Sequence, residues 1–150
     1  MDASEDFARE VRLHVFREAA ATGRVPQPAE IAAGLERPRA DVDRALKALA
    51  AGRVLILAPN DGNIWAANPF CAVPSPFLVD ARDKSYWGIC IWDALGILAS
   101  LGSDGVVRTV CGDCSEPLEL EVAGGRLRRS EGVVHFGVPA HRFWDNIGYT

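Results

Sequence analysis

The chain is organised around one apolar stretch near its middle, Tyr86-Trp87-Gly88-Ile89-Cys90-Ile91-Trp92-Asp93-Ala94-Leu95-Gly96-Ile97-Leu98. This stretch carries one thiol, Cys90, and one carboxylate, Asp93, three residues apart. Gly88 and the lack of proline are compatible with a helix that begins near Ile89, and an i, i+3 spacing turns both groups toward one face of it. Cys90 then lies in the first turn, where unpaired N–H groups and the helix dipole favour a thiolate.

A structural role without function is a plausible alternative for Cys90 but less so for Asp93. A free cysteine is commonly a small buried apolar residue, so Cys90 has a plain packing interpretation. A carboxylate inside an apolar helix is costly unless it is paired or used, which favours a functional role for Asp93. We predict that Cys90 and Asp93 form a catalytic pair facing a common pocket lined by Tyr86, Trp87 or Trp92.

Composition limits the class of protein. The chain has 150 residues, of which 49% are apolar and 24% charged, as expected for a soluble globular protein with one domain or two small ones sharing a core. No run approaches the roughly 18 uninterrupted apolar residues of a membrane span, so we expect no membrane association. The acidic N-terminus lacks a signal-peptide pattern and predicts a cytoplasmic location, where the four cysteines stay reduced.

The N-terminal part has the order of a winged helix-turn-helix. Helical patterns cover residues 4–21, 28–34 and 38–51, and two strand patterns at 53–57 and 63–67 flank a turn at 59–62. We therefore assign residues 1–67 to a winged-helix-like module. Residues 68–80 are rich in proline and form a linker, and residues 81–150 form a second module.

The charge of the first module does not favour binding to nucleic acid. Through Arg53 it holds nine basic and nine acidic residues, and the whole chain has a net charge of −4. A DNA-binding face needs excess positive charge to neutralise phosphates. We expect a packing or lid module, although a thiol- or metal-responsive regulator that binds DNA stays open as an alternative.

The sequence of the second module predicts an α+β fold. A strand begins at 77–79, a charged turn follows at 80–84, and strands are expected at 106–111, 118–122 and 133–138 around turns at 111–114 and 123–126. The fold class is therefore α+β: a three-helix module with a hairpin, then one helix packed on a small, mainly antiparallel sheet.

Cys111-Gly112-Asp113-Cys114 carries the spacing of a metal-binding or redox turn. A structural zinc site needs four ligands, and neither a second such pair nor a suitable histidine pair is present. A redox motif normally opens a helix after a strand, whereas this one leads to Pro117 and another strand pattern. We expect no zinc here, with one thiol buried in the turn and the other incidental.

Several of these segments together resemble the alkylmercury lyases (organomercurial lyases). They are the Cys90-x-x-Asp93 stretch, Val107-Arg108-Thr109-Val110-Cys111, the Pro-Leu-Glu-Leu-Glu-Val strand at 117–122, and the tail from Val138-Pro139-Ala140 to Trp144-Asp145-Asn146-Ile147-Gly148. The resemblance covers nearly the whole chain and implies protonolysis of a carbon–mercury bond, giving a hydrocarbon and Hg(II). It equates Cys90 with the first mercury-binding cysteine, Asp93 with the proton-handling aspartate and Cys111 with a cysteine regarded as structural.

The same resemblance implies a small organomercurial substrate, no cofactor, and small thiols that remove the metal. Mercury would bind Cys90 beside Asp93, with Cys111 or Cys114 as further candidate ligands. The second catalytic cysteine of the family would fall beyond Thr150. We therefore expect a truncated chain, a shorter relative in which Cys71, Cys111 or Cys114 substitutes, or a chain that has lost the mercury chemistry.

One further class of function remains open. The fold could serve a different substrate, with Cys90 as nucleophile and Asp93 as acid and base. A covalent adduct on Cys90 would favour that hypothesis. The sequence leaves the oligomeric state undetermined.

Overall fold

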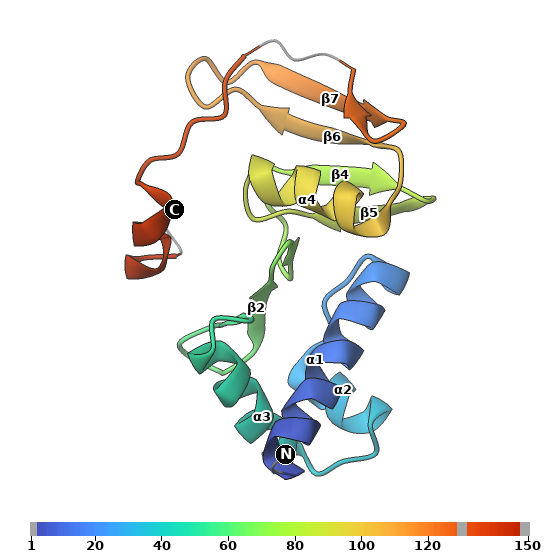
Figure 1. Cartoon of the computed structure of the whole chain (residues 1–150), viewed down its shortest axis with the longest axis vertical. Helices are drawn as coiled ribbons and strands as arrows, with labels where there is room; N and C mark the ends of the chain where they lie inside the picture. Colours follow the sequence, from blue (N-terminus) through green and yellow to red (C-terminus); the bar gives the residue numbers. More distant parts are fainter. Residues whose placement is uncertain (1–2, 129–131, 148–150) are drawn as a thin grey trace.

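Three helices and a short three-stranded sheet form the N-terminal part of the protein (Figure 1). The computed structural model describes residues 3–128 and 132–147. The elements of this part are α1 (Ala3–Thr22), α2 (Pro28–Gly34), α3 (Arg39–Ala51), β1 (Ile56–Leu57), β2 (Ile64–Ala67) and β3 (Phe70–Cys71), with β1, β2 and β3 paired antiparallel in that order. The predicted three-helix module with a hairpin is confirmed. Its first strand is shorter than expected, and the proline-rich segment adds β3 to the sheet.

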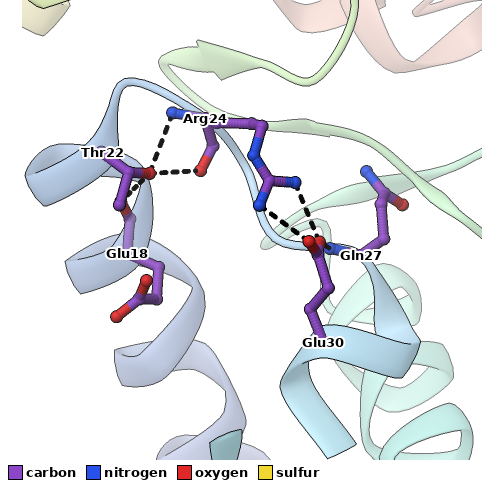
Figure 2. A network of polar contacts seen from close by, with 5 residues as sticks. All are labelled: Glu18, Thr22, Arg24, Gln27 and Glu30. Atoms are coloured by element: carbon purple, nitrogen blue, oxygen red, sulfur yellow. Dashed lines mark hydrogen bonds and ion pairs between the residues drawn. The ribbon is translucent and has the colours of Figure 1, made fainter. Parts of the chain in front are cut away.

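Polar contacts fix the connection between α1 and α2 (Figure 2). The Thr22 hydroxyl donates to the carbonyl of Glu18 at 2.7 Å, and Arg24 forms a two-point ion pair with Glu30 at 3.0 and 2.7 Å. Glu30 also accepts the N–H of Gln27 at 2.7 Å, which closes the start of α2. The Gln27 side chain then bonds both backbone groups of Ile64, so the helix is tied to β2.

A second, five-stranded antiparallel sheet carries the remaining helix. Its strands are β4 (Leu78–Ala81), β5 (Lys84–Trp87), β6 (Gly105–Val110), β7 (Pro117–Ala123) and β8 (Arg126–Leu127), in the order β5-β4-β6-β7-β8, and α4 (Ile91–Leu101) follows β5. Helix α4 packs on β4 and β6 (Figure 1). Val79 of β4 and Val107 of β6 are fully buried. The predicted α+β class is therefore confirmed.

Three local bounds in this part differ slightly from the prediction. The helix expected to begin near Ile89 begins at Ile91, after Tyr86 and Trp87 complete β5. The charged turn is narrower than 80–84: it consists of Arg82 and Asp83, both with positive φ, between strands that otherwise pair. The predicted turn at 123–126 is likewise narrower, since the last of its residues already belongs to β8.

The predicted strand at 133–138 is also not formed. Its β-branched residues favoured a strand, but Val133 is 93% exposed and the segment is irregular in the described structure. A strand needs a neighbouring strand to satisfy its backbone groups. This segment instead runs back past the sheet toward a 3-10 helix, η1 (Ala140–Asp145), as the red end of the chain shows in Figure 1.

One hydrophobic core joins the two parts of the molecule. Buried residues of the three-helix module, such as Val11 and Leu46, and of the second sheet, such as Val79, belong to a single cluster. Tyr86 of β5 is part of it, and its hydroxyl donates to the carbonyl of Ala20 in α1 at 3.0 Å. No helix among the described residues is long and apolar enough to cross a membrane.

Candidate active site at the start of helix α4

The candidate site lies where the chain leaves β5 and enters α4. Gly88 forms an isolated antiparallel bridge with Phe70 of β3, which draws the two sheets together at this point. A Cβ atom on Gly88 would lie 2.8 Å from the backbone nitrogen of Ala94, so only glycine allows α4 to begin so close to the strand. Cys90 follows as the N-cap residue of α4, in an extended conformation with φ −140° and ψ 179°.

The predicted pair is formed, although by a different local geometry. Cys90 was expected in the first turn of the helix, but it is the capping residue, and Asp93 is the third residue of the helix. The side chains at these two positions of a helix start face each other, as in a capping box. The Cys90 thiol donates to Asp93 Oδ2 at 3.3 Å. The i, i+3 spacing therefore brings a thiol and a carboxylate into direct contact.

Burial dominates the electrostatics of this pair. Both side chains are partly buried, and burial raises the pKa of the Asp93 carboxyl, opposed by hydrogen bonds from the thiol and the backbone N–H of Cys90. Burial is also the main cause of the raised pKa of Cys90; the charge of Asp93 and its hydrogen bond act in the same direction. The N–H groups of Asp93 and Trp92 lower the pKa of Cys90 but do not prevail. The prediction that the helix start favours a Cys90 thiolate was wrong for this reason.

Such a pair holds a proton and offers a soft ligand at the same place. The raised pKa of Cys90 favours its thiol form, and that thiol is hydrogen-bonded to Asp93. A soft metal centre that binds the sulfur displaces the thiol proton. Asp93 is the adjacent group able to accept that proton and later to donate it.

The three aromatic residues predicted to line the pocket have different positions. Tyr86 is 1% exposed, its ring lies 5.9 Å from that of Phe70, and its hydroxyl is bonded to α1, so it belongs to the core and its predicted pocket role is corrected. Trp87 is partly buried at the end of β5. Trp92 is 66% exposed, directly before Asp93 in the helix.

Sequence reasoning missed two aromatic residues that approach the site from the tail. The ring of Phe136 lies 6.3 Å from Trp92 in an edge-on arrangement, and Phe143 lies 5.5 Å from Phe136. Further along the same segment, the guanidinium of Arg53 lies 5.5 Å from the ring of Trp144. The tail therefore contacts both the helix of the site and the N-terminal module. The one signal in the sequence was the concentration of aromatic residues in the tail.

The other three cysteines differ in their relation to the site. Cys71 is 7% exposed, and its thiol makes a weak 3.8 Å contact with the carbonyl of Trp65. Burial raises the pKa of Cys71, and the charge of Asp93 contributes to the same shift. The lowered pKa of Cys111 arises instead from groups of its own turn, first among them the N–H of Cys114. Among the described residues, no three His, Cys, Asp or Glu side chains group in a way that could hold a metal ion.

The charged surface of α3 is largely paired within the helix. Arg39 bonds Asp43 at 2.7 Å, and Arg44 pairs with Asp41. Arg37, just before the helix, lies over the ring of Phe7 at 4.4 Å. These contacts reduce the positive charge available to phosphates. The low affinity for nucleic acid stays a prediction.

Fold and site together define a class: an α+β protein in which a helix packed on an antiparallel sheet begins with a cysteine hydrogen-bonded to an aspartate. The sequence profile of the alkylmercury lyase family (MerB) matches residues 70–150, more than half of the chain. The chain belongs to the alkylmercury lyase family.

Comparison with known structures agrees with this assignment at the level of the fold. The crystal structure of the mercury-bound form of MerB2 superposes with a TM-score of 0.60 over 84% of this chain, at 16% sequence identity. The match spans 66% of that protein's chain, slightly less than two thirds of its length. A search of curated proteins gave no match.

Proposed function

We propose that this chain cleaves the carbon–mercury bond of organomercurials by protonolysis, with Cys90 as the mercury ligand and Asp93 as the acid. The observation that carries the proposal is the 3.3 Å contact between the Cys90 thiol and Asp93 Oδ2, in a chain of the alkylmercury lyase family. A soft ligand and a proton carrier are the two groups that this reaction requires, and here they touch each other.

In the first step the organomercurial exchanges its small ligand for the cysteine. The Cys90 sulfur forms a bond to mercury, the bond from mercury to the leaving ligand breaks, and the thiol proton passes to Asp93. The hydrogen bond already present defines the path of that proton. The raised pKa of Asp93 helps it to keep the proton until the second step.

In the second step the proton returns to carbon. Asp93 donates it to the carbon bound to mercury, the carbon–mercury bond breaks, and the hydrocarbon leaves with that proton. Mercury stays on Cys90 as Hg(II) and Asp93 is again a carboxylate. No electron is gained or lost, so the step needs no redox cofactor.

The mercury that remains needs a second sulfur ligand before it can leave. Small thiols supply one from solution, in keeping with a reducing cytoplasm, which we propose as the location of this protein with four free cysteines. Within the chain, Cys71 is the thiol whose environment includes Asp93. It is the natural internal candidate for this role, ahead of Cys111 and Cys114.

The organic group of the substrate would meet the aromatic residues beside the pair. Trp92, which precedes Asp93 in α4, forms a chain of ring contacts with Phe136 and Phe143. Such rings bind hydrocarbon groups by area burial and by ring packing. The three-helix module supports this arrangement by packing on β5 and, through Arg53, by contacting the tail.

The direct test is release of hydrocarbon from an arylmercury salt. Purified protein is incubated with the salt and an excess of a small thiol, and the hydrocarbon is measured by gas chromatography. We expect more than one equivalent of hydrocarbon per chain, above the rate of the thiol alone. Tight retention of the organomercurial with no hydrocarbon would reject catalysis and leave a binding protein.

A further inference from the structure

The turn between β6 and β7 holds the remaining two thiols on a single helical turn. The Ser115 N–H donates to the carbonyl of Cys111 at 3.0 Å, and the Cys111 N–H donates to the carbonyl of Glu116 at 2.8 Å. Ser115 has φ of 60°, which ends the turn as a left-handed residue ends a helix. Residues three apart on one helical turn project to the same side, so Cys111 and Cys114 face together.

Donor groups of the turn surround the sulfur of Cys111. The backbone N–H groups of Cys114 and Asp113 and the thiol of Cys114 are directed at it, so the two thiols lie side by side. Cys111 is partly exposed and Cys114 exposed, so solution reaches both. The expectation that one of these cysteines would be buried in the turn and the other incidental is not met.

Two adjacent thiols with no third ligand suit a soft metal ion that accepts only two ligands. Zinc requires four ligands in a structural site, and no third His, Cys, Asp or Glu joins this pair within the described part of the chain. A soft ion that is satisfied by two thiolates in a linear arrangement needs nothing more.

We propose that Cys111 and Cys114 form a second mercury site, which binds Hg(II) between two thiolates at the surface. Each sulfur forms one bond to mercury as one of the metal's original ligands leaves, and the two thiol protons are released to solvent, so binding changes no oxidation state. The choice of ion rests on the proposed function, whose product is Hg(II). Cys114 is exposed and Cys111 is partly exposed, so Hg(II) in solution can reach both sulfurs.

The test uses inorganic Hg(II) on a chain that lacks the thiols of the candidate active site. In the Cys71→Ser/Cys90→Ser variant, one equivalent of mercuric chloride is added, excess glutathione is applied, and mercury per chain is measured after gel filtration. We expect about one mercury to be retained and two protons to be released. Adding Cys114→Ser should weaken retention by roughly 10²-fold or more, because a second linked ligand acts at high effective concentration.

Asp113→Asn on the same background is the matched control, because it alters the turn but keeps both sulfurs; it should retain the metal. Equal retention with and without Cys114, or no retention by the parent variant, would overturn the site. Should the double variant fail to fold, the wild-type chain and Cys114→Ser are compared, and the proposal requires a difference of one mercury per chain. Because none of these measurements depends on hydrocarbon release, failure of the second site and failure of the proposed catalysis are separable.

Discussion

Cys90 and Cys111 lie beside similar backbone donors, and yet the pKa values of their thiols shift in opposite directions. Each sulfur faces the N–H groups of residues two and three positions further along the chain. At Cys90 the pKa is raised, and at Cys111 it is lowered. The difference is in the surroundings: burial and the neighbouring Asp93 outweigh the donors at Cys90, whereas at Cys111 the donors, with the thiol of Cys114 among them, outweigh burial.

This contrast separates two uses of sulfur in one chain. A thiol that keeps its proton next to a carboxylate suits a reaction that consumes a proton at a bound metal. A thiol that ionises readily beside a second thiol suits reversible capture. N–H donors at the start of a helix therefore do not by themselves decide whether a cysteine is protonated. At Cys90, burial and the neighbouring charge outweigh them.

The largest expected effect comes from Cys90→Ser, which removes the soft ligand of the candidate site. A hydroxyl is a hard and normally protonated group, so hydrocarbon release should fall to the rate of the small thiol alone. Gas chromatography of the hydrocarbon is the measurement, with Cys114→Ser as the matched control. A Cys90→Ser protein that releases hydrocarbon as fast as the control would separate Cys90 from the reaction.

Asp93→Asn should give the next largest loss. The amide keeps the size of the side chain but cannot carry the proton, so turnover should fall by roughly 10²- to 10⁴-fold, the usual contribution of a positioned acid. Binding of the organomercurial to Cys90 should persist, measured as mercury per chain after gel filtration. Asp83→Asn, in the exposed turn between β4 and β5, is the control and should keep full turnover.

The contact between Cys90 and Asp93 was predictable from their spacing, because a carboxylate in an apolar stretch is costly unless a nearby group pairs with it. α2 was predicted with its observed bounds, since Pro28 and Gly34 mark its ends. Whether the opening stretch is strand or helix at Tyr86 was not predictable from an apolar run alone. The decision depends on the pairing of β5 with β4 and on the close approach of Ala94 to Gly88, which are tertiary contacts.

The tail also forms contacts near the candidate site that a local sequence pattern could not predict. Residues 133–138 have strand propensity, but propensity does not supply a partner strand. The contact of Phe136 with Trp92 is tertiary, and its partner lies more than forty positions earlier in the printed sequence. No local pattern links the two rings.

Alkylation of the thiols at different pH values sharpens the contrast between the two cysteines. Iodoacetamide reacts with the thiolate, so Cys111, with its lowered pKa, should be labelled first near neutral pH, and Cys90 should require a higher pH. In Asp93→Asn the labelling curve of Cys90 should move to lower pH, because the charge and the hydrogen bond of Asp93 both raise that pKa. Peptide mass spectrometry gives the extent at each site; an unmoved Cys90 curve would contradict the coupling.

The smallest expected effect is on stability. The folded protein raises the pKa of Asp93, so the favourable contribution of its protonated form is complete below the ordinary carboxyl pKa and is lost as pH rises through the raised value. An asparagine cannot ionise and escapes that loss. Asp93→Asn should therefore melt at a slightly higher temperature than wild type at neutral pH, with the difference vanishing in acid. Calorimetry at both pH values measures it, and a lower melting temperature at neutral pH would contradict the cause assigned to the shift.

The most direct test of the central claim is the mass of the species bound to Asp93→Asn after one equivalent of an arylmercury salt and no added thiol. The Cys90–Asp93 mechanism predicts that wild type carries mercury without its organic group, whereas Asp93→Asn carries the intact organomercury group on Cys90. Intact-protein mass spectrometry distinguishes the two, and peptide mapping locates the adduct. Loss of the organic group from Asp93→Asn at the wild-type rate would contradict the role of Asp93 as the acid.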